Sequence, residues 1–111
     1  MLKPGNYEVV VFEDRSGESP YLEWLEKLDW KTQERILARV ARMQRGQFGD
    51  CKALSGGLYE LRLFFGPGYR VYFGEAKGRV ILILNGGDKS SQRKDINRAK
   101  EYWRIYLQDN P

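Results

Sequence analysis

The segment CKALSGGLYELRLFFGPGYRVYFGEAKGRVILILNGG, which spans residues 51–87, contains three runs that predict β-strands. These runs are Leu58–Phe65, Tyr69–Gly74 and Arg79–Leu84, and they are rich in the aromatic and branched residues that favour strands. The short segments GPG and EAKG separate them, and short turns join strands that pair antiparallel. The VILIL run is apolar at successive positions, which is typical of a central strand covered on both faces. The segment therefore predicts an antiparallel meander.

The residues before this meander predict one strand and two helices. The run YEVVVFE (Tyr7–Glu13) is rich in β-branched and aromatic residues and predicts the first strand. Ser19 followed by Pro20 is a favourable N-cap and first-turn pair for a helix. A second helix is expected over about residues 30–45 and should end at Gly46. Its apolar stripe is expected to contain Ile36, Leu37, Val40 and Met43.

The residues after the meander predict a last helix. Ser90 or Ser91 caps this helix, which is expected to continue to about Leu107. Its inward stripe is expected to contain Ile96, Ala99, Trp103 and Tyr106. The resulting order is β-α-α-β-β-β-α, which predicts an α+β fold whose helices pack on an antiparallel sheet. The length of 111 residues predicts a single domain over residues 1–111.

The composition narrows the chemistry that the chain can perform. There is no His, which is the commonest general base and metal ligand. The single Cys51 excludes an intrachain disulfide and a cysteine-rich metal site. We therefore expect no metal and no cofactor, and any catalysis must use Lys, Arg, Tyr, Asp, Glu or Ser. The sequence shows neither a membrane-spanning apolar run nor a signal peptide, so we expect a cytoplasmic protein.

Positive charge is concentrated after residue 30. Residues 1–30 contain seven acidic and three basic side chains, whereas residues 31–111 contain eight acidic and 16 basic ones. On the second predicted helix the basic residues fall opposite the apolar stripe, and they are Lys31, Arg35, Arg39, Arg42 and Arg45. This cationic face predicts contacts with the phosphates of a nucleic acid. The alternative is a solvated outer face without a ligand.

The segment ILNGGDKSSQRKD (residues 83–95) has some features of a phosphate-binding loop. A Walker loop requires a Gly-Lys-Ser/Thr sequence with an earlier Gly, but Gly87 is followed by Asp88 and the earlier Gly is absent. This mismatch argues against nucleotide hydrolysis. A weaker prediction remains, in which Lys89 and the N-terminal amides of the last helix hold a single phosphate. The alternative is a Gly-Gly turn with a Ser cap and an exposed Lys89.

Two predicted strands carry arginines that lie on one face if the strands pair in a suitable register. Alternation along a strand places Glu60 and Arg62 on one face of the first strand, and Arg70 and Tyr72 on one face of the second. A register that pairs Arg62 with Arg70 or Tyr72 groups two guanidiniums and a phenol. The alternative is that Arg62 pairs with Glu60 or Glu75 as ordinary surface charge.

Two motifs resemble a known protein family. They are L-x-G-G-L-Y-E-L-R (Leu54–Arg62) and G-G-D-K-x-x-Q-x-x-D-I (Gly86–Ile96). Together with the strands around them, they resemble the addiction-module killer proteins, which are HigB-like members of the RelE/ParE toxin superfamily. The resemblance covers almost the whole chain. It implies a small bacterial toxin that is held inactive by a helix-turn-helix antitoxin encoded beside it.

The resemblance also implies where the functional residues lie. RelE-type relatives enter the ribosomal A site and cut mRNA without a metal. Arg62 matches the Arg that follows their Tyr-x-Leu pattern, and Arg70 matches the Arg of their Gly-Tyr-Arg pattern. Lys89 falls where they place a basic residue after the last strand, and Lys52 lies in their basic region before the second strand.

The resemblance is incomplete at the acid and base positions. A Tyr in the last helix of RelE corresponds here to Asp95, and Tyr72 is the nearest alternative phenol. The His that some relatives use is absent. Cleavage needs an acceptor for the 2′-OH proton, and the candidates are Asp88, Asp95, Glu60 or a Tyr72 with a lowered pKa. The sequence does not decide among them.

The combined prediction is a ribosome-dependent, metal-independent mRNA endonuclease that acts as the toxin of a type II toxin–antitoxin system. Its expected partners are the helix-turn-helix antitoxin and the ribosome with its mRNA. The predicted catalytic residues are Arg62, Arg70, Tyr72, Lys89 and Asp95. The predicted RNA-binding residues are Lys52, Arg35, Arg39, Arg42 and Arg45. The alternatives are a ParE-like inhibitor of DNA gyrase, which shares the fold of the nuclease, and a non-catalytic nucleic-acid-binding protein.

Overall fold

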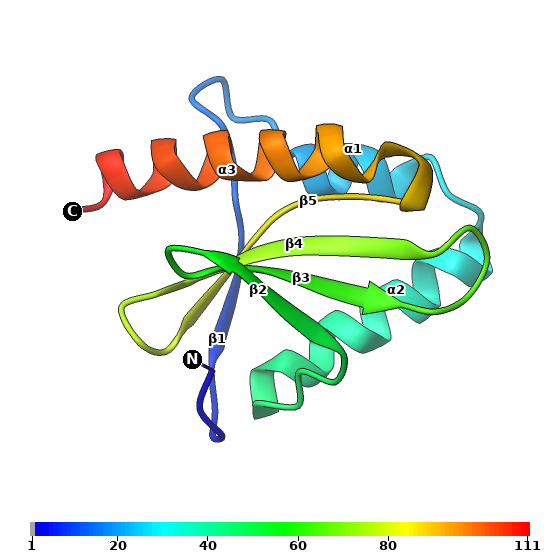
Figure 1. Ribbon diagram of the computed structural model, residues 1–111, viewed down its shortest axis with the longest axis horizontal. Helices are drawn as coiled ribbons and strands as arrows, with labels where there is room; N and C mark the ends of the chain where they lie inside the picture. The colour runs from blue at the N-terminus through cyan, green and yellow to red at the C-terminus, as the bar shows by residue number, and fades with distance from the viewer. Residues whose placement is uncertain (1) are drawn as a thin grey trace.

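The computed structural model describes residues 2–111 and contains a five-stranded sheet with the order β1-β5-β4-β3-β2 (Figure 1). The strands are β1 (Glu8–Val11), β2 (Cys51–Ser55), β3 (Leu58–Leu63), β4 (Tyr69–Ala76) and β5 (Val80–Gly87). The helices are α1 (Pro20–Glu26), α2 (Trp30–Arg42) and α3 (Gln92–Asp109), with 3-10 turns η1 (Met43–Arg45) and η2 (Lys89–Ser91). This architecture confirms the predicted α+β class. Within residues 2–111, no helix has the length and apolarity needed to cross a membrane.

The sheet differs from the sequence prediction by one strand and one pairing. The additional strand β2 pairs antiparallel with β3 through a turn in which Gly56 and Gly57 both have positive φ. A Gly-Gly pair is a strong hairpin signal, but the CKALS run that precedes it has few residues typical of strands. Strand β1 pairs in parallel with β5. Local turn signals do not reveal this pairing, because two helices and three strands separate β1 from β5.

The helices begin and end close to the predicted residues. The Ser19 hydroxyl accepts a hydrogen bond from the Leu22 N–H at 3.2 Å and caps α1. Helix α2 continues as the 3-10 turn η1 and stops at Gly46, which has a φ of 73°. A side chain at Gly46 is also excluded by the backbone of Gly5, which packs directly against it. Backbone conformation and packing therefore both require glycine at this helix end.

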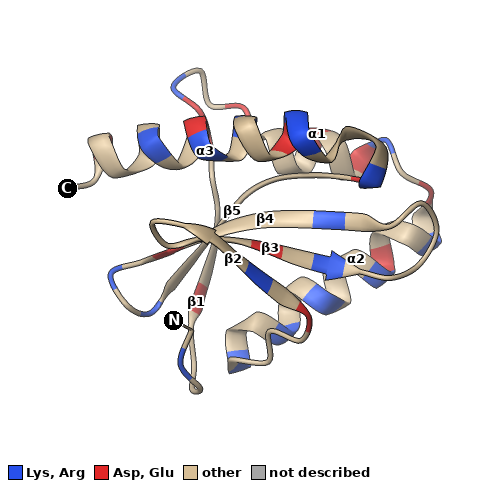
Figure 2. Cartoon of the chain, viewed as in Figure 1, with Lys and Arg blue, Asp and Glu red and all other residues tan. Residues whose placement is uncertain are grey.

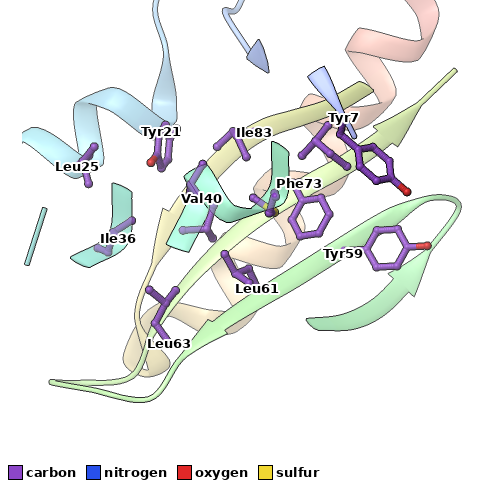
Figure 3. Close-up of a cluster of buried hydrophobic side chains, with 13 residues drawn as sticks. Tyr7, Tyr21, Leu25, Ile36, Val40, Tyr59, Leu61, Leu63, Phe73 and Ile83 are labelled. Atoms are coloured by element: carbon purple, nitrogen blue, oxygen red, sulfur yellow. The ribbon is translucent and has the colours of Figure 1, made fainter. Parts of the chain in front are cut away.

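The two faces of the sheet bury separate cores. Helices α1 and α2 cover one face, where Ile36 and Val40 pack with Leu61, Phe73 and their neighbours (Figure 3). Helix α3 packs on the other face, and its Ala99 and Trp103 are buried against residues of the sheet. The predicted stripe of α2 is wrong at Leu37, which is 45% exposed. Leu37 lies one residue past the buried Ile36 and has turned away from the sheet.

Replacing Ile36 with Ala is expected to lower the free energy of unfolding by about 2–5 kcal/mol, because it removes buried side-chain volume from the core. The same change at Leu37 is the matched control, and it is expected to cost less than about 1 kcal/mol. Urea unfolding followed by circular dichroism measures both values. Equal losses in the two variants would contradict the position of Leu37 outside the core.

Candidate functional site

Strand register brings most of the predicted catalytic residues to one face of the sheet. In the β3–β4 pair, Arg62 lies opposite Arg70 and Glu60 lies opposite Tyr72. In the β2–β3 pair, Lys52 lies opposite Glu60. Residues directly opposite in antiparallel strands share a face, and here it is the face on which α3 packs. Figure 2 shows basic positions along β2, β3 and β4. The predicted pairing of Arg62 with Arg70 is confirmed.

The buried carboxylate of Glu60 is the centre of this group. It accepts hydrogen bonds from Arg62 Nε at 3.0 Å, Tyr72 Oη at 3.1 Å and Gln92 Nε2 at 2.9 Å. Arg70 Nε lies 3.9 Å from the same carboxylate, which is within ion-pair range but too far for a hydrogen bond. Glu60 thus connects β3, β4 and the first turn of α3. The alternative predicted for Arg62, a contact with Glu60, is also present, but it occurs in a buried cluster and not on the surface.

The cluster keeps Glu60 ionised and Tyr72 protonated. Burial alone would raise the pKa of the Glu60 carboxyl, but hydrogen bonds from Gln92, Arg62 and Tyr72 hold that pKa below its usual value. Burial and then the charge of Glu60 raise the pKa of the Tyr72 phenol well above its usual value. Of the four candidate proton acceptors, a Tyr72 with a lowered pKa is therefore wrong. A phenol that is buried and bonded to a carboxylate orients that carboxylate and stays neutral.

The guanidinium groups of Arg62 and Arg70 are reachable from solvent to different degrees. The Arg62 side chain is 29% exposed and that of Arg70 is 11% exposed. Arg70 donates from Nη1 to the Gly68 carbonyl at 2.6 Å, whereas its buried Nε makes no hydrogen bond with residues 2–111. Lys89 is exposed. Its Cβ and the Arg70 guanidinium both border Gly68, because a Cβ built on Gly68 would lie 3.6 Å from Lys89 Cβ and 3.0 Å from Arg70 Nη1. Two guanidiniums therefore lie beside one buried carboxylate, and Lys89 starts next to the Arg70 guanidinium.

The acidic candidates of the GGDK segment lie outside this cluster. Asp95 is buried, accepts a hydrogen bond from the Ser91 hydroxyl and packs against Gly87. Burial is the main cause that raises the pKa of Asp95. The Asp88 side chain caps η2 and accepts from the Ser90 N–H at 2.8 Å, and hydrogen bonds from Ser90 lower the pKa of Asp88. The structure therefore does not place Asp95 in contact with Arg62 or Arg70.

The Gly-Gly pair of the same segment has a packing role. A Cβ at Gly86 would overlap the ring of Trp24 in α1, and a Cβ at Gly87 would overlap the carboxylate of Asp95 in α3. Both glycines are needed because helices approach this strand end closely from its two faces. The close packing explains the glycines without a bound phosphate.

The predicted RNA-binding arginines of α2 lie on the opposite side of β3 from Glu60. Arg35 and Arg39 line a cleft of about 400 Å³ together with Arg42 and Arg62. Arg39 donates to the carbonyl of Arg62 at 3.2 Å and so ties α2 to the end of β3. Arg45 lies on η1 and is exposed outside the lining of this cleft.

Two site residues were not assigned by the sequence. The sequence offers Glu60 as a proton acceptor or as a surface partner of Arg62, whereas in the structure it is buried and holds the other residues. Gln92 was part of the G-G-D-K-x-x-Q pattern and received no role. Its position in that pattern, at the start of the last helix, was the available signal. Among residues 2–111, no three Cys, Asp or Glu side chains form a group able to hold a metal ion.

The Glu60 cluster predicts a specific dependence of stability on pH. Because the pKa of Glu60 is lowered from 4.5 in the folded state, its ionisation stabilises the fold above pH 4.5, and this contribution is lost as the pH falls further. Glu60→Gln is expected to lower the free energy of unfolding at pH 7 by about 3 kcal/mol, because it leaves two partly buried guanidiniums without their counter-charge. In this variant the free energy of unfolding should also fall less steeply as the pH is lowered below 4.5. Urea unfolding between pH 7 and pH 3 measures both effects.

Asp95→Asn is the control for this prediction, because the pKa of Asp95 is shifted in the opposite direction. A raised pKa means that ionisation of the folded-state carboxyl costs stability as the pH rises. Removing Asp95 should therefore make stability increase more steeply with pH. An acid limb that is unchanged in Glu60→Gln would show that Glu60 does not hold its charge in the folded protein.

Comparison with known proteins places this site within a family. The family described as Phage derived protein Gp49-like (DUF891) matches residues 23–104, a range that contains every member of the Glu60 cluster. An uncharacterized protein of Haemophilus influenzae (strain ATCC 51907 / DSM 11121 / KW20 / Rd) is 47% identical over 78 residues. This alignment covers 69% of the present chain and 79% of the relative. The chain therefore belongs to the Gp49-like family of phage-derived proteins.

Proposed function

We propose that this protein is the toxin of a type II toxin–antitoxin system and that it cuts mRNA on the ribosome. The Gp49-like family is associated with the toxins of such systems. The finer proposal is that the chain is a HigB-like member of the RelE/ParE superfamily with metal-independent endonuclease activity. It is supported chiefly by one observation, the two arginines held at the buried Glu60 carboxylate with Lys89 next to Arg70.

This arrangement suits the cleavage of RNA by its own 2′-OH. In that reaction a bond forms between the 2′-oxygen and phosphorus as the 2′-OH loses its proton, and the bond from phosphorus to the 5′-oxygen breaks as that oxygen gains a proton. Arg62 and Arg70 would neutralise the charge that develops on the phosphate oxygens, since a guanidinium binds two such oxygens at once. Lys89 would hold the phosphate or assist the leaving 5′-oxygen. Glu60 holds the two guanidiniums in place, as pre-organised charge requires.

The site lacks a side chain suited to act as general base among the four candidates, which favours a reaction that depends on the ribosome. To be effective, a general base must be reachable by the substrate and must have a pKa near the working pH. Glu60 and Asp88 have lowered pKa values, while Asp95 and Tyr72 have raised ones but are buried. None of the four combines access with a suitable pKa. Positioning of the mRNA by the ribosome would therefore supply a large part of the rate enhancement.

The charge distribution also supports the proposed partners. The exposed basic residues of α2, β2 and η2 suit the phosphates of ribosomal RNA and mRNA (Figure 2). A cognate antitoxin would inhibit the protein by covering these cations or by presenting acidic side chains to them. We place this system in the bacterial cytoplasm, where ribosomes translate.

Cleavage of a defined mRNA on programmed bacterial ribosomes tests the proposal. Purified protein is expected to cut in the A-site codon and to leave a 2′,3′-cyclic phosphate. Arg62→Ala and Arg70→Ala are each expected to slow the cut by about 100-fold or more, because each removes charge stabilisation from the transition state. Arg104→Ala is the matched control, since Arg104 is exposed on α3 and pairs with Glu101.

The remaining outcomes separate the proposal from its alternatives. A thermal unfolding curve for each variant shows whether a loss of cleavage reflects a loss of folding. Toxicity in cells without cleavage would contradict the nuclease and favour a ParE-like gyrase inhibitor, for which supercoiling assays are the direct test. Absence of both cleavage and toxicity would leave a non-catalytic nucleic-acid-binding protein.

Tyr72→Phe separates a positioning role of the phenol from acid–base catalysis. The Tyr72 hydroxyl is buried and donates to Glu60, so its removal should slow cleavage by less than about tenfold. The pH profile of the reaction should keep its shape, because the pKa of the phenol lies above the working range. A large loss of rate with a changed pH profile would contradict this assignment and make Tyr72 a proton donor or acceptor.

A further inference from the structure

Phe64 is an exposed aromatic residue at the end of the strand that carries Arg62. It directly follows β3 and is 76% exposed. Most of its ring is therefore in contact with solvent, although the next residue, Phe65, packs against Tyr69. An exposed aromatic ring beside basic residues is a typical stacking surface for the bases of a single-stranded nucleic acid.

The cleft next to Phe64 is strongly basic. Its lining includes Arg35, Arg39, Arg42 and Arg62, with Asp50 as its only acidic residue, together with Phe64 and Phe65. Its volume is about 400 Å³. The three arginines that α2 contributes and the one carboxylate leave a net positive charge that suits a phosphate.

The arginines of the cleft are arranged on a rigid frame. Arg39 donates to the carbonyls of Phe48 at 3.3 Å and Arg62 at 3.2 Å. The guanidinium carbon of Arg35 lies 3.6 Å from the centroid of the Phe65 ring and so stacks on it. Arg42 forms no ion pair or side-chain hydrogen bond with residues 2–111 and is exposed. Its guanidinium is therefore available to an external anion.

We propose that this cleft binds the nucleotide next to the cleaved phosphate, with its base stacked on Phe64 and its own phosphate on Arg42. The inference rests on the proposed nuclease function and adds a subsite to it. Arg62 links the two places, because its side chain donates to Glu60 while the residue itself belongs to the lining of the cleft. An RNA strand held at Arg62 and Arg70 would thus continue between β3 and α2.

The combination of groups favours RNA over an acidic peptide. Carboxylates of a peptide would pair with the arginines but would leave the Phe64 ring in water. A nucleotide satisfies both, because its base stacks on an aromatic ring while its phosphate accepts hydrogen bonds from arginine. The salt dependence of binding would show how many phosphates are contacted.

Fluorescence anisotropy with a labelled single-stranded RNA hexamer tests this subsite on the full chain without ribosomes. The hexamer carries 2′-O-methyl groups, which prevent cleavage. Phe64→Ala is expected to weaken binding by about 5- to 100-fold through the loss of one stacked base, and Phe64→Trp should restore it. Trp30→Ala is the matched control, since Trp30 is 70% exposed at the start of α2 and lies outside the lining of the cleft. Arg42→Ala should reduce the slope of log affinity against log salt by about one.

RNA binding at the cleft and mRNA cleavage on the ribosome are measured separately, so the subsite and the nuclease function can fail independently. Wild-type affinity in Phe64→Ala, or no binding by the wild type, would overturn the subsite even if ribosomal cleavage occurs. If Phe64→Ala keeps RNA affinity but loses affinity for an acidic peptide, the cleft is a protein-binding surface and the inference is wrong. Selective loss of RNA binding in Phe64→Ala and Arg42→Ala would establish the subsite, and the ribosomal assay would then decide separately whether bound RNA is cut.

Discussion

The contact between the Glu60 carboxylate and its four neighbours holds together the elements that form the candidate site. It joins two strands to the first turn of α3 through Arg62, Tyr72 and Gln92, with Arg70 close by. A buried carboxylate without such partners would be costly, and two clustered guanidiniums without a counter-charge would repel each other. The cluster gives the carboxylate its hydrogen-bond partners and gives the guanidiniums their counter-charge.

Arg62, at the end of β3, contacts both Glu60 and α2, because its side chain and its backbone carbonyl have different partners. The Arg62 side chain belongs to the Glu60 cluster, while its carbonyl accepts a hydrogen bond from Arg39 of α2. The cationic helix is therefore positioned relative to the cluster by a direct bond and not only by the core beneath it. This continuity makes one basic surface from elements that are distant in the sequence, and it connects the proposed cleavage site with the cleft beside Phe64.

Close packing at the end of β5 determines where α3 starts. Gly86 admits the ring of Trp24 on one face, and Gly87 admits the carboxylate of Asp95 on the other. These contacts place η2 and the first turn of α3 beside β4, which brings Lys89 to the Arg70 side chain and Gln92 to Glu60. The glycines contribute to the site through packing, and the cations do so through charge.

The sequence by itself determined the fold class, most helix ends and the identity of the basic residues. These properties follow from local causes, such as alternation along strands, capping at Ser19 and the chain reversal at Gly46. It did not determine the parallel pairing of β1 with β5 or the strand β2, whose composition is weak and whose place depends on its neighbour. Only the tertiary structure decided that Glu60 is buried among two arginines and a phenol, that Asp95 faces Gly87, and that Tyr72 stays protonated. The reason is physical: burial, pKa and ion pairing depend on which residues meet across strands and helices, and sequence periodicity reports only which side of its own element each residue faces.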